Sequence, residues 1–341
     1  MKKVLIMLLL VCIFVSGCST NNLKNNDKGG KNNKVEENQK EEQKKVQIID
    51  LDSDTRPYAV MINCHNSALP QAGLDKAYIV YELMVEGGIT RMMALFKDVD
   101  VDKIGSIRSA RVQYLPYVFE NDAIYIHAGG SPEARKRISN EKIADIDVDG
   151  KYGVRDKTLK RDYEHTLFTT TSLLTKGTND KNLRNTTEVD NLLNYSAEEL
   201  NLSKYETISA NDVSIKYSSY RTSNYEYDSN TKTYLRSMND KKNTDLVTGL
   251  QYQVKNIIVY GVKYTTYTWG NSSTRYQKID TSGNGEGYYI TNGVALPITW
   301  SKSSESSQTV YKIKETGEKL TVNDGNTYIQ IYPTSGKLTI N

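Results

Sequence analysis

The first eighteen residues restrict this chain more than any other part of its sequence. Lys2 and Lys3 provide a positive start, residues 4–15 form an apolar run, and Val15-Ser16-Gly17-Cys18 places small residues directly before a cysteine. A bilayer-spanning helix needs about 20 apolar residues, so this run is too short to be one. Its length and polarity are those of a cleaved signal. The pattern predicts a lipoprotein signal peptide over 1–17 and lipidation of Cys18, with an uncleaved N-terminal anchor as the alternative.

The predicted lipid determines both the location and the cysteine chemistry of the chain. Because a two-chain anchor holds stably to a bilayer, we expect the chain on the outer, extracytoplasmic face of the cell membrane. Cys12 leaves with the signal and Cys18 carries lipid, so Cys64 is alone and no internal disulfide can form. We expect Cys64 to be a buried core residue rather than a reactive thiol.

Composition separates a tether from the folded part. Residues 18–50 are mostly Asn, Lys, Glu, Gln, Asp and Gly, which cannot bury enough apolar area to offset the entropy of ordering. They are predicted to form a disordered tether. The whole chain has 341 residues and a formal net charge of +3. No basic block with interleaved aromatics occurs, which argues against a nucleic-acid partner, and the length predicts two domains.

Residues 51–207 have the pattern of an α/β domain. Apolar runs of strand length lie at 58–62, 77–85, 89–96 and 123–128. Ser131 and Pro132 are typical of a helix start, and Ser109 is a predicted cap for a helix over 110–120. The alternation of strands and helices predicts a central mixed sheet with flanking helices.

Residues 213–341 have a different pattern of turn residues and strand-like runs. Turn signals recur between short strand-like runs, and Asn292-Gly293 is a strong hairpin signal. Tyrosine is frequent here, and both tryptophans lie here. The pattern predicts a smaller, mainly antiparallel β domain. Tyr225 and Tyr227 are candidates for stacking on sugar rings, although cross-strand packing is their commoner role in a sheet.

Two carboxylates and three arginines form the first candidate site. Glu82 and Glu86 are four residues apart on a predicted strand, which separates them by about 13 Å. Since paired acid/base catalysis needs about 5–9.5 Å, they cannot act alone. Arg91, Arg108 and Arg111 lie near the predicted helix start at 110, where free N–H groups favour anions. The cluster is either an anion site or a set of structural salt bridges to the two glutamates.

Histidines provide the remaining candidates. His127 ends a predicted strand and precedes Gly129-Gly130 and Ser131, a common place for ligand contact in α/β sheets. His165 precedes another strand-like run. Glu86 and His127 are the candidate acid/base residues, and His127, Ser131 and His165 join Glu82 and the arginines as candidate ligand contacts. No ligand spacing supports a metal site, and no cofactor is predicted.

The motifs in this region resemble those of the YerB-like lipoprotein family, the DUF3048 family of Gram-positive bacteria. The motifs in the first half are RPYAVMIN at 56–63, PQAGL at 70–74, VYE at 80–82, EGGITR at 86–91, IGSIRSAR at 104–111 and HAGGSP at 127–132. Those in the second half are YLRS at 234–237, VKNIIV at 254–259, GEGYY at 285–289 and ITWSK at 298–302. The resemblance implies a two-domain plan and a surface location, but no established activity. Where family members often carry Pro-His-Asn, this chain has Glu164-His165-Thr166.

Three functional hypotheses follow. The first is a cell-surface lipoprotein that binds an envelope ligand or partner, such as a cell-wall polymer or an envelope protein, through the Arg/Glu/His cluster. The second is a hydrolase or transferase acting on an anionic cell-wall polymer or a lipid-linked phosphate precursor. The third is a structural adaptor for a membrane protein. The first is favoured because no complete catalytic set is present.

Overall fold

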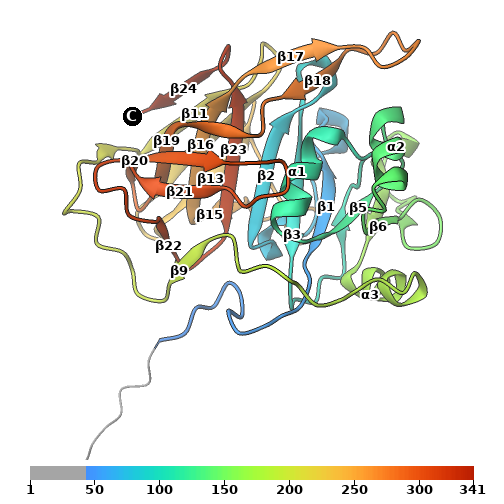
Figure 1. Ribbon diagram of the computed structural model, residues 1–341, viewed down its shortest axis with the longest axis horizontal. Coiled ribbons are helices and arrows are strands. Elements are labelled where there is room, and N and C mark those ends of the chain that lie inside the picture. Colours follow the sequence, from blue (N-terminus) through green and yellow to red (C-terminus); the bar gives the residue numbers. More distant parts are fainter. Residues whose placement is uncertain (1–43) are drawn as a thin grey trace, which may run out of the picture. The chain divides into compact units, whose positions relative to one another are not determined.

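A mixed sheet of eleven strands forms the centre of residues 44–341, the part of the chain that this computed structural model describes (Figure 1). Its order is β10-β20-β19-β16-β23-β2-β3-β1-β5-β6, with β21 paired to β20. The strands are β1 (Tyr58–Asn63), β2 (Ile79–Met84), β3 (Thr90–Phe96), β5 (Ile124–His127), β6 (Asp145–Asp147), β10 (Ile208–Ser209), β16 (Asn256–Val262), β19 (Gly283–Thr291), β20 (Val294–Lys302), β21 (Val310–Ile313) and β23 (Thr327–Pro333).

The pairing of β23 joins the two halves of the sequence. β23 is parallel to β16 on one side and to β2 on the other, where Tyr81 lies opposite Ile329. The predicted mixed sheet in the first half and the antiparallel pairing in the second are confirmed in outline. The two halves do not have separate central sheets, because strands from both contribute to this one. The domain division between 207 and 213 stays a prediction.

A second, antiparallel sheet of six strands has the order β14-β13-β12-β11-β24, with β15 paired to β13. Its strands are β11 (Asp212–Lys216), β12 (Thr222–Asp228), β13 (Thr233–Met238), β14 (Lys241–Lys242), β15 (Gln253–Val254) and β24 (Lys337–Ile340). Three small sheets are formed by β17 (Tyr264–Tyr267) with β18 (Tyr276–Ile279), by β22 (Thr321–Asn323) with β9 (Asn194–Ser196), and by β4 (Ile104–Gly105), β8 (Leu167–Thr169) and β7 (Val154–Arg155).

The helices are short and lie toward the β5–β6 end of the large sheet (Figure 1). They are α1 (Leu115–Glu120), α2 (Pro132–Asn140) and α3 (Thr171–Asp180), with 3₁₀ turns at Asn66–Ala68, Leu74–Lys76, Glu86–Gly88, Val112–Tyr114 and Tyr163–His165. Within the described residues, none of these helices has the length and apolar character needed to cross a membrane.

Ser131 caps α2 as predicted, because its side chain accepts a hydrogen bond from the backbone N–H of Ala134 at 3.2 Å. The predicted helix over 110–120 was wrong in its first half, and Ser109 does not cap it. Ala110 instead bridges to Gly130, and Arg111 is extended, so regular α-helix begins only at Leu115.

Both faces of the large sheet are buried at its central strands, so strands such as β2 alternate between two cores instead of between core and solvent. On one face, Ile79, Tyr81 and Leu83 pack with residues of α1 and α2. On the other face, Val80 belongs to a core that includes residues of α3 and of the six-stranded sheet. Tyr225 is 1% exposed in this second core, so it is not available to stack on a sugar.

The end of the predicted tether lies against the folded part. The backbone N–H groups of Gln47 and Ile48 donate to the two carboxylate oxygens of Asp324, and the side chain of Ile49 is buried. The tether prediction is therefore wrong for 44–50, where an apolar residue and two satisfied backbone donors favour docking. Residues 18–43, Cys18 and the signal peptide lie outside the described residues.

A buried ion pair connects the two large sheets. Glu82 on β2 and Arg236 on β13 are both fully buried, with Nη2 of the arginine 2.9 Å from Oε2 of the glutamate. Thr90 and Ser223 donate hydroxyl hydrogen bonds to the same carboxylate. Burial opposes the charge on Arg236, but the Glu82 carboxylate outweighs this effect and holds the pKa of Arg236 above its ordinary value. Cys64 lies in the same core, where burial raises the pKa of its thiol to about 12.

Replacement of Arg236 by Met is expected to destabilise the protein strongly. The substitution leaves the Glu82 carboxylate buried without its cation, and breaking such a pair costs about 3–5 kcal/mol. Urea unfolding of the full chain measures this cost. The matched control is Lys232→Met, since the ammonium of Lys232 is half exposed and pairs with Glu199 at 2.7 Å; its loss is expected to change stability far less, because exposed ion pairs contribute little. Equal losses in the two variants would contradict a structural role for the buried pair.

Candidate functional site

One edge of the large sheet collects most of the candidate residues. β1, β2, β5, β6, β16 and β23 all run in one direction, and only β3 runs the opposite way among the strands from β16 to β6. Their carboxyl ends therefore meet at one edge, where open α/β sheets commonly bind ligands. At this edge lie Asn63 at the end of β1, Glu86 just after β2, and His127 at the end of β5. Arg91, near the start of the antiparallel β3, lies opposite Asn63 and Leu83 in register.

Arg91 is the innermost arginine of this edge. It is 5% exposed, and its Nη1 donates to the backbone carbonyl of Ser109 at 2.5 Å. No carboxylate of the described residues lies within 4.0 Å of its guanidinium nitrogens. Burial, together with the nearby positive charges of Arg111 and Arg108, lowers the pKa of Arg91 to about 10. Arg91 remains charged at neutral pH, and Glu86 is near enough to oppose part of the lowering, but no carboxylate among residues 44–341 pairs with Arg91 directly.

Arg111 is fixed by Glu86. The Nε of Arg111 lies 2.6 Å from Oε1 of Glu86, and its Nη1 donates to the carbonyl of Ala110 at 2.8 Å. Glu86 begins the turn after β2, in which Gly87 and Gly88 both have a positive φ (69° and 71°) that other residues rarely adopt. This turn directs the carboxylate of Glu86 toward the loop that carries Arg111.

Arg108 and His165 form the more accessible side of the cluster. The side chain of Arg108 is 24% exposed, and its Nη2 lies 3.5 Å from Oε1 of Glu164, whose own side chain is 58% exposed. Burial and the charge of Arg111 lower the pKa of Arg108, although Glu164 partly opposes them. His165 is buried, and its ring stacks on the exposed ring of His65 with centroids 5.0 Å apart.

Asn63 sets the proton position on His165. The side-chain oxygen of Asn63 accepts from the backbone N–H of His65 at 3.0 Å, so its amide nitrogen faces Nδ1 of His165 at 2.9 Å. Because the amide nitrogen can only donate, Nδ1 is the acceptor and the proton of the neutral ring is assigned to Nε2. His165 Nε2 is 3.6 Å from Oε1 of Glu164, so His165 presents an N–H on the same side as Arg108.

Three of the candidate residues lie apart from this cluster. Glu82 pairs with Arg236 between the sheets, and Ser131 caps α2. His127 is 3% exposed and its Nε2 lies 3.2 Å from Oδ2 of Asp145, although neither ring nitrogen makes a well-formed hydrogen bond to a described residue. The structure therefore brings together Glu86, the three arginines and His165, which we name the arginine cluster. Among residues 44–341, no group of three or more His, Cys, Asp or Glu side chains is arranged to hold a metal ion.

Asn63 and Glu164 complete the cluster but were not predicted as site residues. The position of Asn63 at the carboxyl end of a buried strand was an available signal. Glu164 offered none, because its contact with Arg108 spans 56 residues. Arg236, the partner of Glu82, is 154 residues away in sequence and could not be identified from local spacing.

Comparison with known proteins finds the same family in both halves. Residues 46–184 match the N-terminal domain, and residues 213–329 the C-terminal domain, of the family described as "protein of unknown function (DUF3048)". The chain is 29% identical over 287 residues to "Putative lipoprotein YerB" of Bacillus subtilis (strain 168), covering 82% of each chain. A crystal structure of the YerB protein from Bacillus subtilis superimposes with a TM-score of 0.70 and 27% identity, covering 84% of this chain and 94% of that one.

His165 is expected to make stability depend on pH. Burial lowers the pKa of His165 below its ordinary value of 6.5, so the unfolded chain binds this proton more readily than the folded chain. The contribution of His165 to the free energy of unfolding is therefore complete above pH 6.5 and declines as the pH falls below that value. The free energy of unfolding, measured from about pH 7.5 to about pH 5, should fall less steeply in His165→Gln than in the wild type. Parallel curves for the two proteins would show that His165 is not the responsible group.

Proposed function

The chain belongs to the DUF3048 family, and from this premise we propose that it is a cell-surface lipoprotein that binds an anionic group of an envelope ligand through its arginine cluster. The lipid on Cys18 attaches it to the outer face of the cell membrane. The anionic group is a phosphate or carboxylate, carried by a cell-wall polymer or by an envelope protein.

The unpaired charge of Arg91 is the observation that carries this proposal. A buried guanidinium is costly unless an anion compensates it. Among the described residues the guanidinium of Arg91 hydrogen-bonds a carbonyl and no carboxylate, and two further arginines lower its pKa. The cluster has three arginines against two carboxylates, Glu86 and Glu164, so it carries one excess positive charge even with His165 neutral. A bound anion would supply the missing charge.

Arg108 and His165 are the contacts best placed to meet such an anion. The contact from Arg108 to Glu164 is long, at 3.5 Å, and Glu164 is well exposed, so a ligand oxygen can replace this carboxylate at little cost. The N–H on Nε2 of His165 lies beside the same position. Arg111 is already engaged by Glu86, so its role is to position the loop and contribute to the positive field.

The alternatives have less support. For a hydrolase or transferase, the candidate acid/base residues are Glu86 and His127, but Glu86 is paired with Arg111 and His127 lies against Asp145. Neither is paired with a described nucleophile. A purely structural adaptor does not account for a buried arginine without a carboxylate.

Replacement of Arg108 by Ala is expected to weaken anion binding without unfolding the protein. Hydrogen bonds to charged groups contribute about 1.5–3 kcal/mol, so affinity should fall by about 10- to 100-fold. Calorimetric titration of the full chain, purified in detergent, with inorganic pyrophosphate and with a glycerol phosphate polymer measures this loss. Comparison of the two probes distinguishes a small anion from a wall polymer.

The matched control is Arg137→Ala. Arg137 is a partly exposed arginine of α2 that pairs with Glu141 and Glu305 outside the cluster, so its loss should leave anion affinity unchanged. Equal weakening in both variants would indicate non-specific charge attraction. Failure of Arg108→Ala to fold, or no binding of either probe by the wild type, would remove the basis of the proposal.

A further inference from the structure

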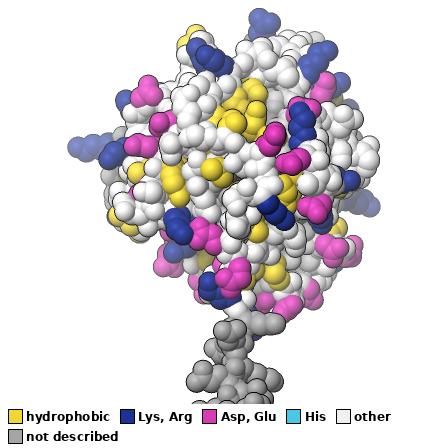
Figure 2. Space-filling view, turned by 90° about the vertical axis from the view of Figure 1, so that its left-hand side faces the viewer, with side chains coloured by type: hydrophobic (Ala, Val, Ile, Leu, Met, Phe, Trp, Pro, Cys, Tyr) yellow, Lys and Arg dark blue, Asp and Glu magenta, His cyan; other side chains and the backbone are white. Residues whose placement is uncertain are grey.

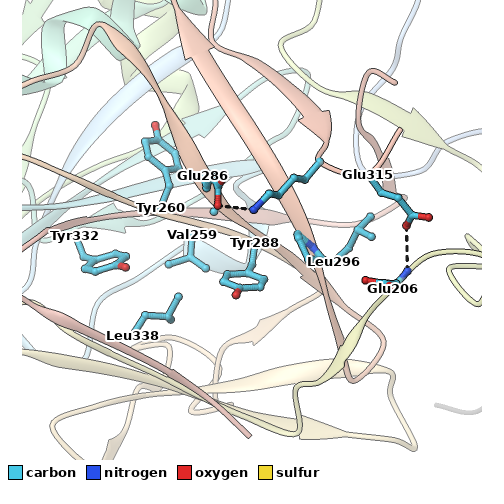
Figure 3. A pocket seen from close by; sticks show the side chains of 12 residues that line it. Glu206, Val259, Tyr260, Glu286, Tyr288, Leu296, Glu315, Tyr332 and Leu338 are labelled. Carbon is cyan, nitrogen blue, oxygen red and sulfur yellow. Dashed lines mark hydrogen bonds and ion pairs between the residues drawn. The ribbon is translucent and has the colours of Figure 1, made fainter. Parts of the chain in front are cut away.

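A second candidate site lies on the other half of the large sheet, remote in sequence from the arginine cluster. A pocket of about 470 Å³ opens on the face formed by β16, β19, β20 and β23, next to β24, which is an edge strand of the six-stranded sheet (Figure 3). Figure 2 looks onto the end of the molecule at left in Figure 1, near β20 and β24, and shows apolar side chains gathered among acidic and basic ones.

Two tyrosines form much of the floor. Tyr288 on β19 lies between Val259 on β16 and Pro297 on β20 in register, so these three side chains share one face of the sheet. Tyr332 on β23 lies opposite Gly261, where an added Cβ would come within 3.2 Å of the tyrosine ring. Both tyrosines are half-buried, and burial raises the pKa of Tyr332. The floor thus presents aromatic surface in a partly dry setting.

The rim is acidic. Glu286 and Lys314 form an ion pair at 2.7 Å on one side of the opening. On another side, Glu315 accepts a hydrogen bond from the backbone N–H of Glu206 at 3.2 Å, which holds these two glutamates together (Figure 3). No lysine or arginine of the described residues lies within 4.0 Å of the carboxylate of Glu206 or Glu315. With three carboxylates and one ammonium, the rim has a net charge of −2 at neutral pH.

We propose that this pocket binds a primary ammonium group attached to an apolar or ring-shaped body. The body packs on the rings of Tyr288 and Tyr332, which provide the apolar surface of the pocket. The ammonium lies near Glu206 and Glu315, which compensate its charge. Two envelope sources present this chemistry, a lysine side chain of an extended peptide and an unacetylated amino sugar.

The charges of the pocket exclude the ligand class proposed for the arginine cluster. An anionic group would be repelled by Glu206 and Glu315 and would meet only Lys314, which is already paired with Glu286. A neutral ring could pack on the tyrosines but would leave both carboxylates without a partner. The two sites therefore take groups of opposite sign, and loss of one should not abolish the other.

The test is titration of the full chain in detergent with four probes, in which binding is measured by NMR or calorimetry. Glucosamine and an Nα-acetylated lysine amide carry the ammonium, whereas N-acetylglucosamine and the corresponding norleucine amide lack it. We expect at least one ammonium probe to bind about 10-fold or more tightly than its neutral analogue. Preference for the lysine amide identifies a peptide source, and preference for glucosamine identifies an amino sugar.

Four variants test whether the binding occurs in the pocket. Glu206→Gln combined with Glu315→Gln should weaken the ammonium probe by about 10-fold, and Tyr288→Leu should weaken it severalfold. Glu318→Gln is the matched control, since Glu318 is an exposed acid outside the pocket and its replacement should change nothing. Arg108→Ala should also leave this binding intact, which separates the result from that of the arginine cluster.

Four outcomes overturn the proposal. Equal binding of the neutral and ammonium probes would make the acidic rim irrelevant. Unchanged affinity in the double glutamate variant, or an equal loss in Glu318→Gln, would place the binding elsewhere or make it a general charge effect. Absence of binding by every probe to the correctly folded wild type would show that the pocket does not take this class of ligand.

Discussion

The parallel pairing of β23 with β16 and β2 holds both halves of the chain in a single sheet. It places a strand from the end of the chain next to a strand from its first third. It also places Gln330 beside Glu82 in register. The side-chain oxygen of Gln330 accepts a hydrogen bond from Tyr217, which follows β11, and the Glu82 carboxylate accepts from Ser223 and Arg236 of the six-stranded sheet. Because a buried carboxylate requires its cation, the two sheets must close together.

The same pairing produces the edge at which the arginine cluster lies. Six strands end at this edge, and β3 begins there, so Arg91 is held between β1 and β2 by ladder hydrogen bonds on both sides. A guanidinium in the middle of a sheet cannot move far to find a partner. The loops at 86–88 and 108–111 bring further charges to it, and Asn63 orients His165 from the end of β1. Charge that is rigidly placed and incompletely neutralised is a feature of binding sites rather than of stable cores.

The strands of the first half are predictable from the sequence, because long apolar runs bounded by turn residues favour buried strands over other structures. Sequence reasoning also located the cap at Ser131 and the hairpin at Asn292-Gly293, where local chemistry decides. It failed where partners are distant. The helix predicted to start at Ala110 was displaced because that residue bridges to Gly130. Glu82 was grouped with the cluster because nothing near it in sequence reveals Arg236. Tyr225 remained a candidate for stacking on sugars, beside the commoner packing role, because alternation does not reveal that its face is covered.

The net charge of the chain is small, although two of its sites have local electrostatic fields of opposite sign. A net charge of +3 over 341 residues suggests no charged partner, yet the arginine cluster has excess positive charge and the pocket beside β24 has excess negative charge. Fields decay within about 10 Å in salt, so a ligand responds to the nearest groups and not to the total. Both sites border one continuous sheet, which supplies Arg91 to one site and Tyr288 and Tyr332 to the other, whereas most of their other charged residues lie on turns and loops. Such an arrangement suits a protein that contacts two chemically different components of one surface.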